Sequence, residues 1–174
     1  MNAVGFTSFA FRWGLESLKR DGANAIARCQ WLIEKARHYG ANAVQLCENS
    51  DFMAIDAASA KNLARVAREY GIRLETGVRE SDVAQLRVSV QRAETLGARI
   101  VRVVLEKGAR HHGLSDTAAL LSKYLSSDSS AVVIAVENHF RYRPDEVRAL
   151  IEMVGDSRIG VCLDPTNAIT HFVD

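Results

Sequence analysis

The sequence contains only three cysteines, two prolines and two tryptophans among its 174 residues. The cysteines (Cys29, Cys47 and Cys162) form no CxxC motif and are too few for a disulfide framework, which indicates a reducing, cytoplasmic location. No apolar run approaches the roughly 18 residues that a membrane-spanning helix needs. The N-terminus also lacks the basic start, long apolar core and cleavage site of a signal peptide. These absences argue against a membrane protein and against a small disulfide-linked secreted domain.

A basic nucleic-acid-binding surface is also missing. The 22 Lys and Arg residues nearly balance the 21 Asp and Glu residues, and no Lys/Arg run is longer than two. The hydrophobic share of 48% and the charged share of 25% are typical of a globular protein. We therefore expect a single domain over residues 1–174, with neither nucleic acid nor membrane as a partner.

Four glycines recur at intervals close to 30 residues or to twice that length. Gly40, Gly71, Gly97 and Gly155 each follow a helical pattern and precede an apolar run, which is where a helix needs a left-handed residue at its C-terminal cap. The interval between Gly97 and Gly155 is two periods long, and no glycine stands at its middle. The serine-rich segment 126–130 lies there, and we expect it to serve as a turn. A period of this length is that of one strand–helix unit.

Six short apolar runs provide the strands. Three of them are almost continuously apolar and rich in β-branched residues, which is typical of strands that are buried on both faces of a parallel sheet. Helical patterns lie between the runs, so six strands are expected to alternate with five helices. Among the helix starts, Ser115-Asp116 and Pro144-Asp145-Glu146 carry capping signals. The predicted strands are residues 4–9, 43–47, 73–76, 100–105, 132–136 and 159–163.

Two α/β architectures fit this alternation. An open doubly wound sheet usually carries a glycine-rich phosphate-binding turn after its first strand, and the sequence has neither GxGxxG nor GxxxxGK[ST]. The pattern therefore favours a (β/α)8 TIM barrel that is incomplete at its C-terminal side, with about six βα repeats instead of eight.

The reactive groups of parallel α/β folds collect at the carboxyl ends of the strands. Glu137 follows the apolar run 132–136 directly, and Asp164 follows the run 159–163. The two acids are 27 residues apart, about one repeat, so we expect equivalent positions on adjacent strands roughly 5 Å apart. Carboxylates held that close repel each other unless they share a proton or a cation. The pair therefore predicts a divalent-metal site, although an acid at a strand end can instead cap the helix that follows.

The residues around these two acids resemble a known family. The segments 136–139 (VENH) and 160–167 (GVCLDPTN) are similar to the xylose isomerase-like TIM-barrel superfamily of sugar and sugar-phosphate isomerases and epimerases. The segments 5–11 (GFTSFAF) and 96–102 (LGARIVR) are similar to the same group. The resemblance implies Glu137 and Asp164 as metal ligands and Asn167 as a substrate contact. By their position directly after Glu137, Asn138 and His139 are further substrate-binding candidates, with packing in the loop as the alternative for His139. The resemblance also implies a His and a Glu from a seventh and an eighth strand, which lie beyond the six predicted here.

The resemblance implies a divalent-metal-dependent isomerase or epimerase of a sugar or sugar phosphate that works through an enediolate. Glu137 would act as both ligand and catalytic acid/base, and oxygen ligands favour Mn²⁺, Mg²⁺ or Co²⁺, with Zn²⁺ also feasible. Two alternatives stay open. One is a related dehydratase or lyase on a dehydroshikimate-like substrate, and the other is a catalytically incomplete barrel fragment with a binding role. A homo-oligomer that covers the open barrel edges is a further expectation.

Several other residues are weaker candidates for this site. Arg141 and Arg143 would suit a phosphate or carboxylate, but a solvated basic loop is the more common arrangement. His111 and His112 belong to a loop that follows a predicted strand. Glu75 lies near the end of another strand, where burial would require an arginine partner.

Overall fold

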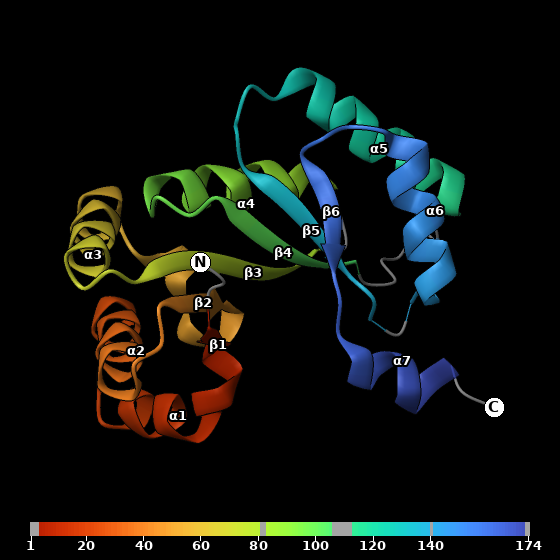
Figure 1. Ribbon diagram of the computed structural model, residues 1–174. Helices are drawn as coiled ribbons and strands as arrows, with labels where there is room; N and C mark the ends of the chain where they lie inside the picture. The colour runs from red at the N-terminus through yellow and green to blue at the C-terminus, as the bar shows by residue number, and fades with distance from the viewer. Residues whose placement is uncertain (1–3, 81–82, 106–112, 140, 173–174) are drawn as a thin grey trace. The chain divides into compact units, whose positions relative to one another are not determined.

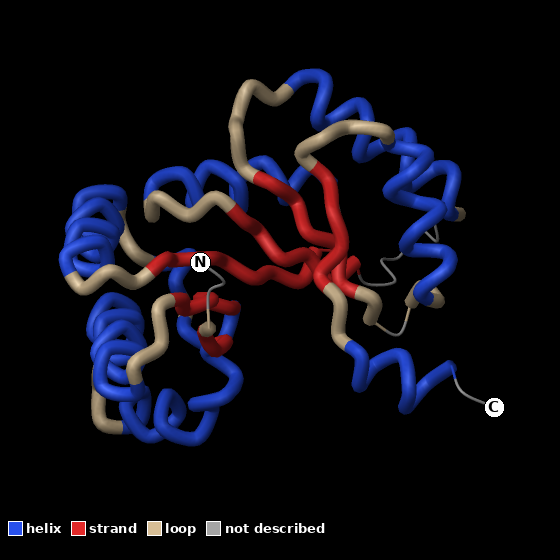
Figure 2. Tube along the Cα trace, in the orientation of Figure 1, coloured by secondary structure: helices blue, strands red, loops and turns tan. Residues whose placement is uncertain are grey.

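A computed structural model of the protein describes residues 4–80, 83–105, 113–139 and 141–172. It confirms an α/β fold in which six parallel strands alternate with helices, as in part of a TIM barrel (Figures 1 and 2). The strands are β1 (Gly5–Thr7), β2 (Ala43–Cys47), β3 (Arg73–Glu80), β4 (Ile100–Leu105), β5 (Val133–Glu137) and β6 (Ile159–Cys162). The α-helices are α1 (Arg12–Arg20), α2 (Ala25–Tyr39), α3 (Ala57–Glu69), α4 (Val83–Thr95), α5 (Leu114–Ser127), α6 (Pro144–Val154) and α7 (Pro165–Phe172). None of the described helices is both long enough and apolar enough to cross a membrane.

The chain divides into two compact units. The first comprises Met1–Gly77 with Gln91–Arg99, and the second comprises Val78–Val90 with Ile100–Asp174. In the first unit, β1 pairs with β2 and β2 with β3, all in parallel, and α2 packs against β2 and α3. The core of this unit consists of fully buried side chains from its helices and strands, among them Leu32, Ile33, Leu46, Phe52 and Leu63.

Strand β1 is shorter than predicted, because residues Ser8–Phe11 form a 3-10 helix instead of extending it. The buried Ser8 hydroxyl accepts a hydrogen bond from the Cys47 backbone N–H (2.9 Å) and donates to the Asn49 side chain. The Asn49 amide in turn donates to the Ser8 carbonyl oxygen (3.2 Å). These contacts turn the chain after Thr7 and join the end of β1 to the end of β2.

In the second unit, β4 pairs with β5 and β5 with β6, again in parallel, and α5 lies beside α6 (Figure 1). Strands β4 and β5 are largely buried, as their apolar sequences predicted. The expectation of burial on both faces is wrong for the last strand, where Val161 is 48% exposed and Leu163, just beyond the strand, is 69% exposed. The reason is that β6 has one strand neighbour, β5, among the described residues.

The predicted helix ends are confirmed at all four glycines, which adopt left-handed φ values between 64° and 69°. The serine-rich segment also ends a helix, but Asp128 at its C-terminal cap is extended instead of left-handed. Pro144 begins α6, and the Glu146 carboxylate accepts from the Arg143 backbone N–H (2.7 Å), as the sequence indicated. Ser115 is not a cap, because α5 begins one residue earlier with Gly113 as its N-cap. Helices α1 and α7 add to the five that were expected between the strands.

Two buried threonines give a matched test of the core. Replacing Thr76 by valine is expected to raise the free energy of unfolding by about 1 kcal/mol, because its buried hydroxyl has no hydrogen-bond partner among the described residues. Thr117→Val is expected to lower it by about 1 kcal/mol, because the hydroxyls of Thr117 and Tyr142 bond each other at 3.0 Å. Urea unfolding measures both changes as shifts of the midpoint, and shifts of the same sign would contradict this account.

Candidate functional site

The candidate site lies where β5 and β6 end. The predicted equivalence of Glu137 and Asp164 is wrong by two residues, because Glu137 pairs with Cys162 in the parallel register. Two residues of extended chain correspond to roughly 6–7 Å along the strand direction. Equal spacing in the sequence did not translate into equal positions in the sheet, because neighbouring strands of a barrel are staggered.

The Asp164 carboxylate caps the helix that follows it. Its Oδ1 accepts hydrogen bonds from the backbone N–H groups of Thr166 (2.8 Å) and Asn167 (3.3 Å) in the first turn of α7. The capping role that the sequence left open is therefore present. It uses one carboxylate oxygen only, and Oδ2 accepts no hydrogen bond within the described part of the chain. That oxygen remains available for a cation.

The Glu137 carboxylate has a partner on each oxygen. Its Oε2 lies 3.3 Å from Nε of Arg102, and its Oε1 accepts a hydrogen bond of 3.3 Å from the Asn167 side-chain amide. The exposed fraction of the side chain is 14% for Glu137 and 7% for Arg102, so the ion pair is largely shielded from water. Asn167 therefore contacts both carboxylates, through its side chain at Glu137 and through its backbone N–H at Asp164.

Asn138 joins the two strand ends. Its side-chain amide donates to the Asp164 carbonyl oxygen at 2.7 Å, and its Oδ1 accepts from the Asp164 backbone N–H at 2.6 Å. Asn138 is only 1% exposed. The structure thus brings together four of the five predicted site residues, namely Glu137, Asn138, Asp164 and Asn167.

The fifth predicted residue, His139, follows Asn138 directly in the chain. Its backbone N–H donates to the Glu137 carbonyl oxygen (2.8 Å), and the residue is half-buried. The arginines that follow have local partners, because Arg141 lies over the Tyr142 ring at 4.8 Å and Arg143 lies 3.7 Å from the Asp145 carboxylate. His111 and His112 lie outside the described residues.

Glu75 belongs to the first unit and has the arginine partner that its burial was expected to require. Its Oε1 lies 2.8 Å from Nη2 of Arg73, which precedes it by two residues in β3. Its Oε2 accepts a hydrogen bond of 3.4 Å from the Gln45 side-chain amide. These side chains line a cavity of about 220 Å³ together with residues of β1 and Ala43.

Arg102 contacts Glu137 in the site but was not predicted as a site residue. A signal was present, because Arg102 is the only charged residue in the otherwise apolar run Ile100–Leu105. A charge at such a position needs a buried partner. The pattern alone did not indicate which acid that partner is, since Glu137 lies one strand away.

The donors present fit a hard divalent cation in part. Two carboxylates from neighbouring strand ends supply oxygen ligands of the type that Mg²⁺ or Mn²⁺ takes. Among the described residues, no third His, Cys, Asp or Glu lies close enough to complete a cluster. The described residues therefore include two of the four positions that the resemblance implies as metal ligands.

The protein is thus an α/β protein with part of a TIM barrel, and polar residues lie at the ends of its last two described strands. The chain belongs to the xylose isomerase-like TIM-barrel family, whose model matches residues 33–172. A curated relative, 3-oxo-isoapionate decarboxylase of Pectobacterium atrosepticum, is 24% identical over 168 residues. That match covers 96% of this chain but only 60% of the relative, so the chain spans little more than half of the relative's length.

Solved structures share the fold at low sequence identity. D-psicose 3-epimerase in the presence of D-fructose gives a TM-score of 0.66 at 14% identity, over 83% of this chain and 61% of that one. D-psicose 3-epimerase from Clostridium cellulolyticum H10 with D-tagatose gives a TM-score of 0.69 at 15% identity, with 83% and 60% covered. The IOLI protein with a bound zinc atom gives a TM-score of 0.65 at 10% identity, with 99% and 66% covered.

Proposed function

We propose that the chain carries part of the active site of a divalent-metal-dependent enzyme that isomerises or epimerises a sugar or a sugar derivative. The observation that carries this proposal is the network at the ends of β5 and β6, in which Asn167 contacts both the Glu137 and the Asp164 carboxylates. The family membership and the fold shared with two D-psicose 3-epimerase structures support it. The zinc atom in the structure of the IOLI protein supports a metal.

The roles of the residues follow from their contacts. Glu137 and Asp164 would hold the cation, which when bound would supply Lewis-acid polarisation of a substrate carbonyl and hydroxyl. Glu137 would also take the proton from the carbon next to that carbonyl. Returning this proton to the former carbonyl carbon, while the hydroxyl proton passes to the former carbonyl oxygen, gives an isomer. An epimer forms when an acid on the opposite face returns a proton to the same carbon. Asn167 is half-buried beside both carboxylates and is the best placed substrate contact in this group.

A second candidate reaction is decarboxylation, which the curated relative favours. The bond between a carboxylate and the adjacent carbon would break, CO₂ would leave, and the electron pair left on carbon would take a proton from an acid. The same polarised carbonyl stabilises that electron pair, so both candidates use Glu137 and Asp164 in the same place. The products distinguish them, because only decarboxylation of a 3-oxo acid releases CO₂.

Binding of Mn²⁺ tests the proposed site without an assay of turnover. Wild-type chain is expected to bind Mn²⁺, and Glu137→Gln and Asp164→Asn are each expected to raise the Kd by tenfold or more, because each removes one anionic ligand. Glu75→Gln is a matched control, since it neutralises a paired strand carboxylate in the first unit. Its Kd should equal that of wild type, and isothermal titration calorimetry at pH 7 measures all four proteins.

Two results would contradict the proposal. One is a wild-type chain that does not bind Mn²⁺, and the other is a Glu137→Gln variant that binds it as tightly as wild type. Transfer of deuterium from D₂O to the carbons flanking the carbonyl of a ketohexose, followed by NMR, then tests proton transfer itself. Glu137→Gln is expected to abolish this exchange.

A further inference from the structure

The side chain of Asn138 forms a bridge that the ordinary strand ladder does not provide. The register of β5 with β6 ends at the pair Glu137 and Cys162, and Leu163 and Asp164 follow outside the strand. Beyond this end, the Asn138 amide makes two hydrogen bonds, of 2.7 and 2.6 Å, to the carbonyl oxygen and the N–H group of Asp164. A side-chain amide contains the same donor and acceptor as a peptide group, so it replaces the missing strand neighbour.

This bridge holds the backbone of Asp164 to the side chain of Asn138. Asn138 is adjacent to Glu137 in the chain, and both main-chain polar groups of Asp164 bond to its side chain. Further along, Asp164 Oδ1 is held by the first turn of α7. The main chain and one carboxylate oxygen of Asp164 are therefore fixed, while Oδ2 is left available.

We infer that Asn138 is a positioning residue, which sets the location of Asp164 relative to Glu137, and that it does not contact the substrate. Its exposure of 1% and the use of both amide atoms on Asp164 leave little surface for a ligand. This inference rests on the proposed metal site, and it replaces the substrate-binding role that was predicted for Asn138 from the sequence. Among the uncharged side chains, only Asn and Gln combine a planar amide donor with a carbonyl acceptor, so few substitutions preserve the bridge.

Two variants test this role against a control. Asn138→Ala removes both hydrogen bonds, and Asn138→Gln keeps the amide but adds a methylene, so both bonds form only if Asp164 moves. The control is Asn42→Ala in the first unit, where Asn42 Oδ1 accepts from the Val4 backbone N–H at 2.8 Å. This control also removes a hydrogen bond between an asparagine side chain and the backbone, but one that belongs to the other unit.

Two measurements are made on each protein, the Kd for Mn²⁺ and the hydrogen-exchange rate of the Asp164 amide by NMR. Asn138→Ala is expected to raise the Kd and the exchange rate by tenfold or more. Asn138→Gln is expected to raise the Kd by a similar factor, and Asn42→Ala should change neither quantity. All titrations are made well below the thermal midpoint of each variant, so that a loss of stability alone does not alter the Kd. If the alanine variant does not fold, the glutamine variant supplies the test.

The outcomes separate the inference from the proposed function. Wild-type affinity for Mn²⁺ in a folded Asn138 variant would overturn the positioning role, and so would unchanged exchange of the Asp164 amide in Asn138→Ala. A wild-type chain that does not bind Mn²⁺ would overturn the proposed function itself, and Asn138 would then be a structural residue only. Loss of affinity in the Asn138 variants together with wild-type affinity in Asn42→Ala supports the inference.

Discussion

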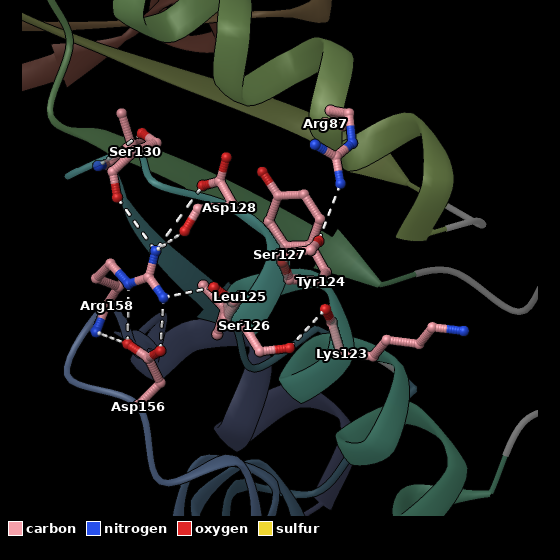
Figure 3. Close-up of polar contacts among 11 residues, drawn as sticks. Arg87, Lys123, Tyr124, Leu125, Ser126, Ser127, Asp128, Ser130, Asp156 and Arg158 are labelled. Atoms are coloured by element: carbon pink, nitrogen blue, oxygen red, sulfur yellow. Dashed lines mark hydrogen bonds and ion pairs between the residues drawn. The ribbon is translucent and has the colours of Figure 1, made fainter.

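Replacing Arg158 by methionine is expected to lower the free energy of unfolding by roughly 2–3 kcal/mol, although Arg158 lies far along the chain from the helix that it stabilises. Its guanidinium donates to three backbone carbonyl oxygens, of Leu125 (2.6 Å), Asp128 (2.7 Å) and Ser130 (3.2 Å) (Figure 3). It also pairs with the Asp156 carboxylate at 2.7 Å. Methionine retains much of the apolar stem but no donor. The side chain is 24% exposed, so water replaces part of what is lost.

Arg158 stabilises the fold because it bonds to backbone groups at the C-terminal end of α5. The last carbonyl groups of a helix have no partner within the helix. The other helix ends that precede a strand in this chain have a left-handed glycine, but α5 ends at Ser127 and is followed by an extended Asp128. The Arg158 guanidinium satisfies carbonyl oxygens at this end and in the turn that leads into β5. Its loss would leave these groups to water at a junction between α5, β5 and β6.

The effect of this substitution is expected to depend on pH. The hydrogen bond from Arg158 lowers the pKa of Asp156 below its ordinary value of 3.8. A carboxyl whose pKa is lower in the folded state adds stability above its ordinary pKa and loses that contribution as the pH falls through the lowered value. The difference between wild type and Arg158→Met should therefore be larger at pH 7 than at pH 3, as measured by urea unfolding.

Arg148→Met is the control for Arg158→Met. Arg148 forms an exposed pair with Glu152 within α6, at 2.8 Å, and such pairs contribute little to stability. The midpoint of this control should stay close to that of wild type. An Arg158→Met midpoint that coincides with the control would show that the carbonyl contacts do not stabilise the fold.

The repeating architecture was predictable from the sequence, because local signals carry it. The apolar runs 43–47 and 100–105 match β2 and β4 at both ends, and the four glycines end helices as expected. Each of these signals depends on neighbours within a few residues. The end of α5 has no glycine, and the chain was expected to turn there, which it does between α5 and β5. Arg158 lies about 30 residues away, and no local pattern connects it to that turn.

Most residues of the candidate site were predictable from the sequence, but Arg102 and the geometry of the site were not. Glu137 and Asp164 were identified because an acid at the end of an apolar strand is conspicuous. Their relative position depends on the stagger between strands, which is a property of the sheet and not of either segment. The hydrogen bonds of Asn138 to Asp164 depend on that stagger, and so does the positioning role that we infer for Asn138. A local sequence pattern shows which side chains are polar but not which backbone groups they reach.

The ion pair between Arg102 and Glu137 leads to the second large effect. Arg102→Met and Glu137→Met are each expected to lower the free energy of unfolding by about 3 kcal/mol, because each removes one partner of a largely buried ion pair. The double variant is expected to lose much less than the sum of the two. Two apolar side chains of similar size replace the pair without leaving a charge behind, and such replacements are often neutral or stabilising. Urea unfolding of the four proteins gives the coupling energy.

An exposed pair provides the control for this cycle. Arg65 and Glu69 form an ion pair within α3 with side chains 55% and 56% exposed, so the same substitutions there should give a coupling energy below about 0.5 kcal/mol. Additive losses for Arg102 and Glu137 would contradict the account. The double variant is also expected to fold but to have lost its affinity for Mn²⁺, because it lacks the Glu137 carboxylate. A buried charge pair that an apolar pair can replace without loss of stability is not required by the fold, so the reason for an acid at this strand end would be what it binds.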